Sequence, residues 1–282
     1  RRIREILSEE PVIESPEHGI TSVTTGAVRF ENVSFKYQAD NNSAVEDLRL
    51  TIKPGEKVGI LGRIGSGKST MLKLASGLYD TEKGNVTLDG VDMRQLDPNF
   101  LRDQVLLLSQ SPRLFLGTLR ENMDLARTGS YSTDQDLLIA LNRFGLDKII
   151  RNHPRGLDMP LGEDGLGLSG GQKQIIALAR MTLRDPKVVL LDEPTTSLDQ
   201  GTERMALNAI AQWGRNRTML LVTHRPQVLQ IVNRIIVMEN GKVVMDGPRD
   251  LVLQKLMQNE QNKVKAAQQA QENQRPNEAA QA

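Results

Sequence analysis

One stretch decides the fold of this chain: Gly62-Arg63-Ile64-Gly65-Ser66-Gly67-Lys68-Ser69-Thr70. It fits the phosphate-binding pattern of a glycine, four residues, and then Gly-Lys-Ser/Thr. Glycines let such a loop turn tightly and point its N–H groups inward, where a β-phosphate can bind at the N-terminus of the following helix. We expect Lys68 to reach the β- and γ-phosphates and the Ser69 hydroxyl to bind Mg²⁺. The alternative is a glycine turn that only happens to precede a lysine.

The segments on either side of the loop support nucleotide binding. Residues 56–61 (Glu-Lys-Val-Gly-Ile-Leu) are typical of a buried strand, and residues 71–75 are predicted to start a helix. Strand, glycine loop and helix thus follow in the order that the motif requires.

Strands and helices alternate along the rest of the chain. Further strands are predicted over residues 28–37, 44–52, 84–90, 105–109, 187–191, 218–223 and 235–238. Helices are predicted over 134–144, within a segment from 113 to 168 that lacks strand character, and from 168 to about 183. This alternation predicts an α/β fold with a mostly parallel sheet, whose ligands bind beyond the carboxyl ends of the strands.

Polar side chains follow these strands. They are Gln110, Asp192, Glu193 and His224. Asp192 is placed to hold Mg²⁺ directly or through water, and Glu193 to act as general base toward an attacking water. The alternatives are a solvated turn for the two acids, a structural role for the histidine and an exposed surface position for the glutamine.

A second anion site is predicted at residues 168–172, Leu-Ser-Gly-Gly-Gln. A Ser-Gly-Gly start to a helix offers free N–H groups and the positive end of the helix dipole. Two phosphate-binding helix N-termini for one nucleotide are unusual.

Composition excludes several kinds of protein. The 282 residues carry 36 basic and 35 acidic side chains, a net charge of +1, which argues against a nucleic-acid surface built on bulk charge. There is no cysteine, so disulfides and thiolate metal sites are excluded. No apolar run reaches the roughly 18 residues of a membrane-spanning helix.

Taken together, these residues resemble the ATP-binding cassette (ABC) ATPases over roughly residues 25–250. The matching motifs are Walker A at 62–70, the Q-loop at Gln110, the signature at 168–172, Walker B at 188–192 followed by Glu193, the D-loop Ser197-Leu198-Asp199, the switch histidine His224 and the A-loop aromatic Tyr37. They occur in the family's order. Ile175 departs from the family pattern, which usually has a basic or small residue there.

The resemblance implies a RecA-like P-loop ATPase core with a mostly parallel sheet, an N-terminal antiparallel β subdomain and a helical subdomain at about 113–184. It implies ATP and Mg²⁺ as cofactors. It also implies a head-to-tail homodimer, in which each ATP lies between Walker A of one copy and the signature of the other. The implied catalytic residues are Glu193, His224 and Lys68, and the implied metal ligands are Ser69, Gln110 and Asp192. The implied ATP contacts are Tyr37, the nine residues Gly62 to Thr70, Gln110, Ser169, Gly170, Gly171, Gln172 and Asp199.

The resemblance also suggests how the chain is divided. Because it begins with Arg1 rather than Met, residues 1–20 are expected to be a linker from a transmembrane domain that this sequence lacks. Residues 21–257 form the ATP-binding domain, and residues 258–282, which are mostly Gln, Asn, Ala, Lys and Glu, are expected to be a frayed helix or a disordered tail. The expected location is the cytoplasmic face of the bacterial inner membrane.

Two stretches are similar to those of exporters, residues 111–122 after the Q-loop and 162–165 before the signature. Residues 62–69 and 97–102 are similar to type I secretion ATPases for RTX toxins or adhesins. That resemblance implies an exported protein substrate, a periplasmic adaptor and an outer-membrane channel as partners. A drug, lipid or peptide exporter is the alternative.

Two other classes fit less well. A DNA-acting ABC ATPase needs a long coiled coil between Walker A and the signature, and only about 100 residues without sustained heptads intervene. A switch GTPase needs an Asn-Lys-x-Asp stretch, which is not present.

Overall fold

A computed structural model describes residues 16, 19–23, 25–37, 42–126 and 133–274. Most of the linker predicted over residues 1–20 lies outside these ranges. Of its described part, Ile20 forms an isolated parallel bridge with Leu96.

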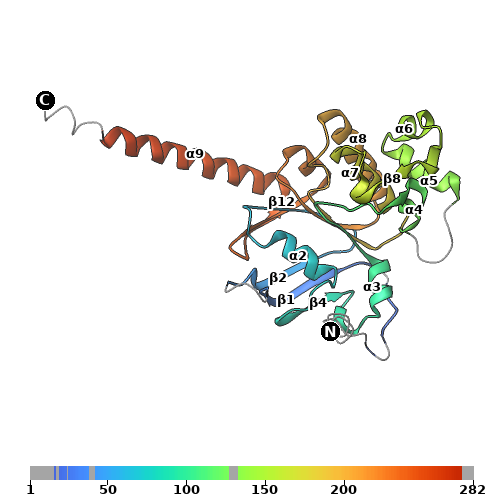
Figure 1. Cartoon of the computed structure of the whole chain (residues 1–282). Helices are drawn as coiled ribbons and strands as arrows, with labels where there is room; N and C mark the ends of the chain where they lie inside the picture. The colour runs from blue at the N-terminus through green and yellow to red at the C-terminus, as the bar shows by residue number, and fades with distance from the viewer. Residues whose placement is uncertain (1–15, 17–18, 24, 38–41, 127–132, 275–282) are drawn as a thin grey trace, which may run out of the picture.

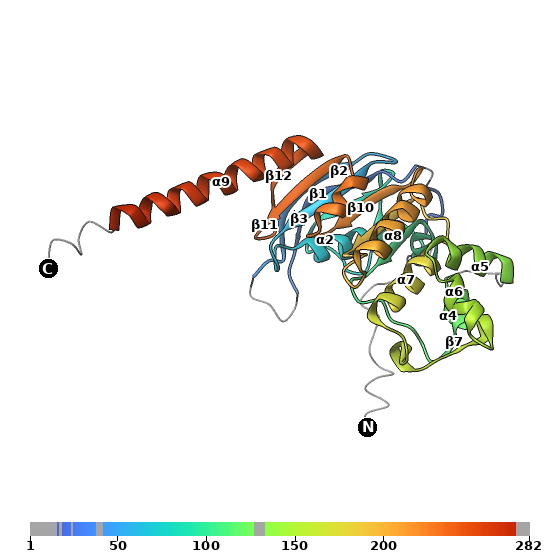
Figure 2. The same cartoon turned by 90° about the horizontal axis from the view of Figure 1, so that it is seen from above.

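The central element is a six-stranded sheet in the order β12-β11-β3-β10-β9-β6. Its strand β12 is labelled in Figure 1, and β11, β3 and β10 are labelled in Figure 2. Its strands are β3 (Lys57–Gly62), β6 (Val105–Leu108), β9 (Val188–Asp192), β10 (Thr218–Val222), β11 (Arg234–Glu239) and β12 (Lys242–Pro248). All neighbours pair in parallel except β11 and β12, which are antiparallel. The mostly parallel sheet predicted from the sequence is therefore confirmed.

The first strands of the chain form a separate four-stranded sheet in the order β2-β1-β4-β5. Its strands are β1 (Val28–Phe35), β2 (Val45–Ile52), β4 (Lys83–Leu88) and β5 (Val91–Asp92), and every neighbouring pair is antiparallel. This is the expected antiparallel β subdomain. The prediction that the first strand reaches Tyr37 is wrong, because β1 ends two residues earlier.

The helices cover the two faces of the large sheet differently. α2 (Lys68–Ala75) packs between the two sheets, in a core with Val188 and Leu190 of β9. α7 (Gly170–Met181) and α8 (Gln200–Trp213) pack in the other core, with Val189 and Leu191. Since successive strand residues point to opposite faces, α2 and α7 lie on opposite sides of the sheet (Figures 1 and 2).

The region around α7 is mainly helical, as predicted. It contains α4 (Leu119–Asp124), α5 (Asp134–Arg143), α6 (Asp147–Asn152) and the 3-10 turns Gly156–Asp158 and Glu163–Gly165. Two short strands, β7 (Gly117–Thr118) and β8 (Pro160–Leu161), pair within it. α3 (Pro98–Gln104) and the 3-10 turns Met93–Gln95 and Pro226–Ile231 complete the elements before the last helix.

The last helix, α9 (Arg249–Gln274), projects away from the rest of the molecule in both views (Figures 1 and 2). It includes residues 258–274 of the segment for which a frayed helix or a disordered tail is expected. Gln, Ala, Lys and Glu are good helix formers, and no proline interrupts them before Pro276.

Among the helices of the described residues, none is both long enough and apolar enough to cross a membrane.

Candidate nucleotide-binding and catalytic site

The glycine loop joins β3 to α2 at the carboxyl edge of the large sheet. Gly65 and Gly67 have φ angles of 80° and 94°, a left-handed conformation that glycine adopts without strain. The helix begins at Lys68, three residues earlier than predicted, and the Gly67 carbonyl accepts the Met71 N–H at 2.8 Å. The motif's own residues therefore form the first turn of α2, and Ala75 is its last residue rather than part of its start.

Lys68 reaches back over the loop. Its Nζ donates to the carbonyl oxygens of Gly62 at 2.8 Å and Arg63 at 2.7 Å and to Ser66 Oγ at 3.2 Å. Burial lowers the pKa of Lys68, while the nearby charges of Glu193 and Asp192 act in the opposite direction. The ammonium group is thus held at the loop, where a phosphate would exchange for these carbonyl contacts.

A hollow of about 440 Å³ opens beside the loop, and Tyr37 forms part of its wall. The Tyr37 hydroxyl lies 3.1 Å from Thr70 Oγ1, and the ring packs edge-on against Phe35 and Tyr79. Lys73 Nζ is 5.7 Å from the Tyr37 ring centroid. These contacts hold the half-buried Tyr37 ring beside the loop.

Asp192 ends β9 next to the loop, because β9, β10 and β3 run parallel and in register there. The Ser69 hydroxyl hydrogen-bonds its carboxylate. Burial raises the pKa of Asp192, and the negative charge of Glu193 adds to this, whereas the Ser69 bond and the Lys68 charge oppose it.

This pair of oxygen donors fits Mg²⁺. Magnesium prefers hard oxygen ligands and is usually held by one or two protein groups together with phosphates and water. Within the described residues there is no cluster of three or more His, Cys, Asp or Glu side chains that could hold a metal by itself. Ser69 and Asp192 could thus hold a magnesium ion whose other ligands are phosphate oxygens and water.

Glu193 is nearly buried and turns at the end of β9. Its φ angle is +50°, unusual for a residue with a side chain, and its N–H donates to the Val222 carbonyl at 2.9 Å. Its Oε1 lies 2.8 Å from His224 Nδ1, and His224 itself is 68% exposed. The carboxylate is therefore shielded from bulk water, while its histidine partner faces solvent.

The structure adds a residue that sequence reasoning missed. Gln174 is 2% exposed, its Nε2 donates to the Glu193 carbonyl at 3.0 Å, and its Oε1 accepts the Ser197 N–H at 2.8 Å. A glutamine at a buried position of an otherwise apolar helix face is the signal that the sequence contained.

Two further predicted site residues, Gln110 and Asp199, lie beyond the end of β6 and at the start of α8. Gln110 is exposed two residues beyond β6, at the same edge of the sheet as Asp192. Asp199 caps α8 by accepting the N–H groups of Gly201 and Thr202, and hydrogen bonds from Thr202 lower its pKa.

The signature residues form the start of α7. Ser169 Oγ accepts the Gln172 N–H at 3.2 Å, and Gln172 Oε1 accepts the Ser169 N–H at 2.8 Å, a reciprocal capping box. Ser169 and Gly170 are exposed. Because α7 and α2 lie on opposite faces of the sheet, one copy of the chain does not bring its signature and its glycine loop together.

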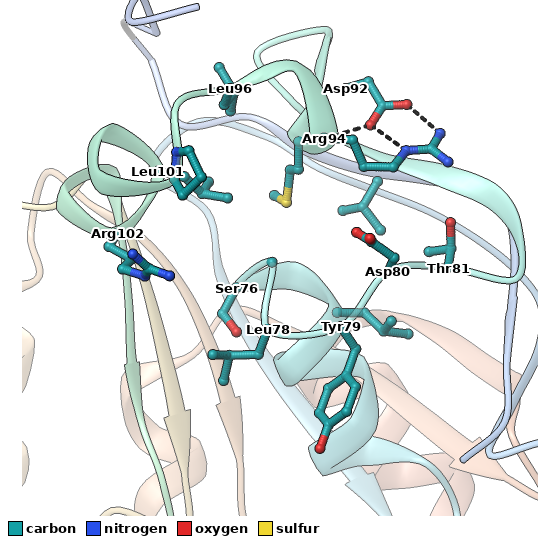
Figure 3. A pocket seen from close by; sticks show the side chains of 15 residues that line it. Ser76, Leu78, Tyr79, Asp80, Thr81, Asp92, Arg94, Leu96, Leu101 and Arg102 are labelled. Carbon is teal, nitrogen blue, oxygen red and sulfur yellow. Dashed lines mark hydrogen bonds and ion pairs between the residues drawn. The ribbon is translucent and has the colours of Figure 1, made fainter. Parts of the chain in front are cut away.

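A second hollow, of about 300 Å³, lies beyond the carboxyl end of α2 (Figure 3). Its lining is more apolar than polar, and Asp92 and Arg94 form an ion pair at 2.6 Å in its wall. Tyr79 lines this hollow and also packs against Tyr37, at a ring-centroid distance of 5.5 Å. The two hollows therefore share an aromatic wall.

Comparison with known proteins gives consistent matches. Residues 45–196 match the protein family described as ABC transporter. An uncharacterized ABC transporter ATP-binding protein, YwjA of Bacillus subtilis, is 36% identical over 86% of this chain and 42% of its own length. The ATP-dependent lipid A-core flippase of Escherichia coli K12 is 39% identical, over 82% of this chain and 39% of its own length.

A solved structure is similar as well. A bacterial Atm1-family ABC exporter with ATP bound superposes with a TM-score of 0.83 at 29% identity, over 90% of this chain and 44% of the other. The chain thus spans about two fifths of the length of the relatives it matches.

Proposed function

The chain belongs to the ABC transporter family as an ATP-hydrolysing domain, and from that premise we propose that it powers an exporter together with a membrane-spanning domain. One observation carries this proposal. A shielded carboxylate, Glu193, lies beside the Ser69–Asp192 pair and the Lys68 ammonium at the carboxyl edge of the sheet.

We propose the following roles, which this geometry supports. The glycine loop and Lys68 hold the β- and γ-phosphates, and Tyr37 stacks on the adenine. Ser69 and Asp192, with Gln110, would hold Mg²⁺, which would supply positive charge that neutralises the phosphates. Glu193 takes a proton from the attacking water, and His224 contacts the γ-phosphate.

The proposed second phosphate site, residues 169–172 at the N-terminus of α7, requires a second copy of the chain. Since α2 and α7 lie on opposite faces of one sheet, the exposed N-terminus of α7 can reach a γ-phosphate only on the loop of a partner. We propose a two-fold dimer with two such sites, each completed by residues 169–172 and Asp199 of the other copy. ATP then joins the copies, and hydrolysis releases them.

The exported substrate is better sought among lipids and other small molecules than among proteins. Type I secretion, which the sequence favours, finds no support in the comparisons, and neither do a protein substrate, a periplasmic adaptor or an outer-membrane channel. Named relatives are lipid A-core flippases and an Atm1-family exporter. The alternative drawn from the sequence, a drug, lipid or peptide exporter, is therefore our proposal.

We also propose the division and location inferred from the sequence. Residues 21–257 form the ATP-binding domain, which works on the cytoplasmic face of a bacterial cell membrane against its membrane domain. The competing function, an ABC ATPase acting on DNA, predicts ATPase activity that DNA stimulates and that the membrane domain leaves unchanged. Such a result would refute the proposed role in transport and favour a role on DNA.

The test is Glu193→Gln, which keeps the shape of the side chain but removes the base. We expect turnover to fall by at least about 10²-fold with ATP binding retained. Light scattering during gel filtration should show a dimer with ATP and a monomer with ADP. Adding Ser169→Arg to this variant should abolish the dimer, because the arginine would occupy the partner's phosphate site. Near-normal turnover, or a dimer that tolerates Ser169→Arg, would refute the proposed arrangement.

A further inference from the structure

Gln174 is a buried amide with both ends engaged. It lies in the second turn of α7, four residues after the exposed Gly170, and only 2% of it is accessible. Its neighbours Ile175 and Ile176 belong to the apolar core. A polar side chain buried in an apolar core destabilises the folded chain unless it is hydrogen-bonded. In Gln174 the amide nitrogen donates one hydrogen bond and the amide oxygen accepts another.

The partners of Gln174 are parts of the candidate catalytic site. Its Nε2 donates to the Glu193 carbonyl at 3.0 Å, and its Oε1 accepts the Ser197 N–H at 2.8 Å. One side chain therefore joins the signature helix to the candidate base and to the loop that leads to Asp199.

The backbone of Glu193 needs such support. A φ angle of +50° is disfavoured for a residue with a Cβ and persists where neighbouring contacts determine it. The Glu193 N–H donates to the Val222 carbonyl. The Glu193 carbonyl accepts from Gln174 Nε2 at 3.0 Å, from Thr196 Oγ1 at 3.2 Å and from the Thr196 N–H at 3.4 Å, so Gln174 supplies the shortest of three hydrogen bonds. This backbone conformation aims the carboxylate at His224.

We propose that Gln174 is a positioning residue for ATP hydrolysis, which holds the Glu193 backbone in the conformation that aims its carboxylate. The proposal rests on Glu193 being the base, as argued above. Its consequence concerns the dimer. The N-terminus of α7 serves the ATP on the partner's loop, whereas Glu193 serves the ATP on its own loop, so Gln174 connects the two sites through one side chain.

A double-mutant cycle in the purified chain tests this. Gln174→Met removes both hydrogen bonds at similar volume, and a matched control, Gln212→Met, makes the same change at an exposed position of α8. Because small misplacements of a catalytic group are costly, we expect Gln174→Met to lower kcat about tenfold or more. ATP affinity, and ATP-driven dimerisation measured in the Glu193→Gln background, should stay within about twofold.

The decisive readout is non-additivity. If Gln174 acts through Glu193, Gln174→Met should cost about tenfold in the wild type and less than about twofold in the Glu193→Gln background. A merely structural role predicts a lower melting temperature with kcat unchanged, or an equal loss of kcat in both backgrounds. Either result would overturn the proposal.

A second variant covers failure of the first to fold. Gln174→Leu also removes both hydrogen bonds but places a stiffer apolar side chain in the apolar core, so kcat should fall again. Wild-type kcat in a folded Gln174→Leu variant would refute the positioning role while leaving the proposed function intact. Normal turnover of Glu193→Gln alone would instead remove the base assignment, and the role of Gln174 with it.

Discussion

Gly67 offers the sharpest test of how the loop is built. Its φ angle is +94°, and a Cβ added there would lie 2.3 Å from the carbonyl oxygen of Ala44. Ala44 has little freedom to move, because its N–H donates to Phe35 and its neighbour Glu46 donates to the Gly241 carbonyl. Gly67→Ala therefore combines an unfavourable backbone conformation with a clash against fixed backbone.

A matched control separates the two effects. Gly65 has a similar φ angle of +80°, but nothing lies within 4 Å of an added Cβ. A left-handed conformation costs a residue other than glycine about 1–2 kcal/mol, partly offset by about 0.4–1 kcal/mol from a less flexible unfolded chain. Forcing an extra carbon into packed backbone costs about 1–3 kcal/mol more. We expect Gly65→Ala to lower the free energy of unfolding by about 1 kcal/mol and Gly67→Ala by about 2–4 kcal/mol.

The assay is urea unfolding of the nucleotide-free chain, followed by circular dichroism and by the fluorescence of Trp213, the single tryptophan. Without nucleotide, the comparison concerns stability alone. If Gly65→Ala and Gly67→Ala unfold at the same urea concentration, the close approach of Gly67 to Ala44 does not destabilise an alanine at position 67. The reasoning is then refuted.

Three further predictions concern charged side chains elsewhere in the chain. Lys68→Ala should weaken ATP binding about 10²-fold, measured with a fluorescent analogue, because a charged hydrogen-bond donor to the phosphates is lost. Unchanged affinity would contradict the role of Lys68 in phosphate binding. Glu203→Ala should lower the free energy of unfolding by roughly 2–4 kcal/mol, because it removes the buried carboxylate that lies 2.8 Å from the Arg225 guanidinium and accepts the Thr195 hydroxyl at 2.7 Å; a change below about 0.5 kcal/mol would refute this. For Asp89, burial favours a higher pKa, but hydrogen bonds from residues 25–27 outweigh it and lower the pKa to about 2. The folded-state pKa is depressed, so this stabilisation is fully present above pH ~4 and is lost as pH falls through about 2. Asp89→Asn should therefore cost about 1 kcal/mol at neutral pH after discounting for solvent, and less than about half of that at about pH 2; a cost that is the same at both pH values would contradict it.

The strands and the loop between them were predictable because their signals are local. Continuous apolar runs at 105–109, 187–191 and 218–223 match β6, β9 and β10 to within a residue at each end. Other elements were not. β12 was missed because Lys242–Pro248 is a half-exposed edge strand that ends in Asp-Gly-Pro, a sequence typical of turns.

Strand direction and periodicity follow from neighbouring residues, so the residues that end the parallel strands could be predicted, and with them the meeting of Asp192, Glu193 and His224 with the glycine loop at one edge. The position of α2 and α7 on opposite faces, and the contact of Gln174 with the Glu193 carbonyl, became visible in the folded chain alone. Those contacts join segments far apart in the chain, and they depend on how the side chains of two cores pack, which no local pattern specifies.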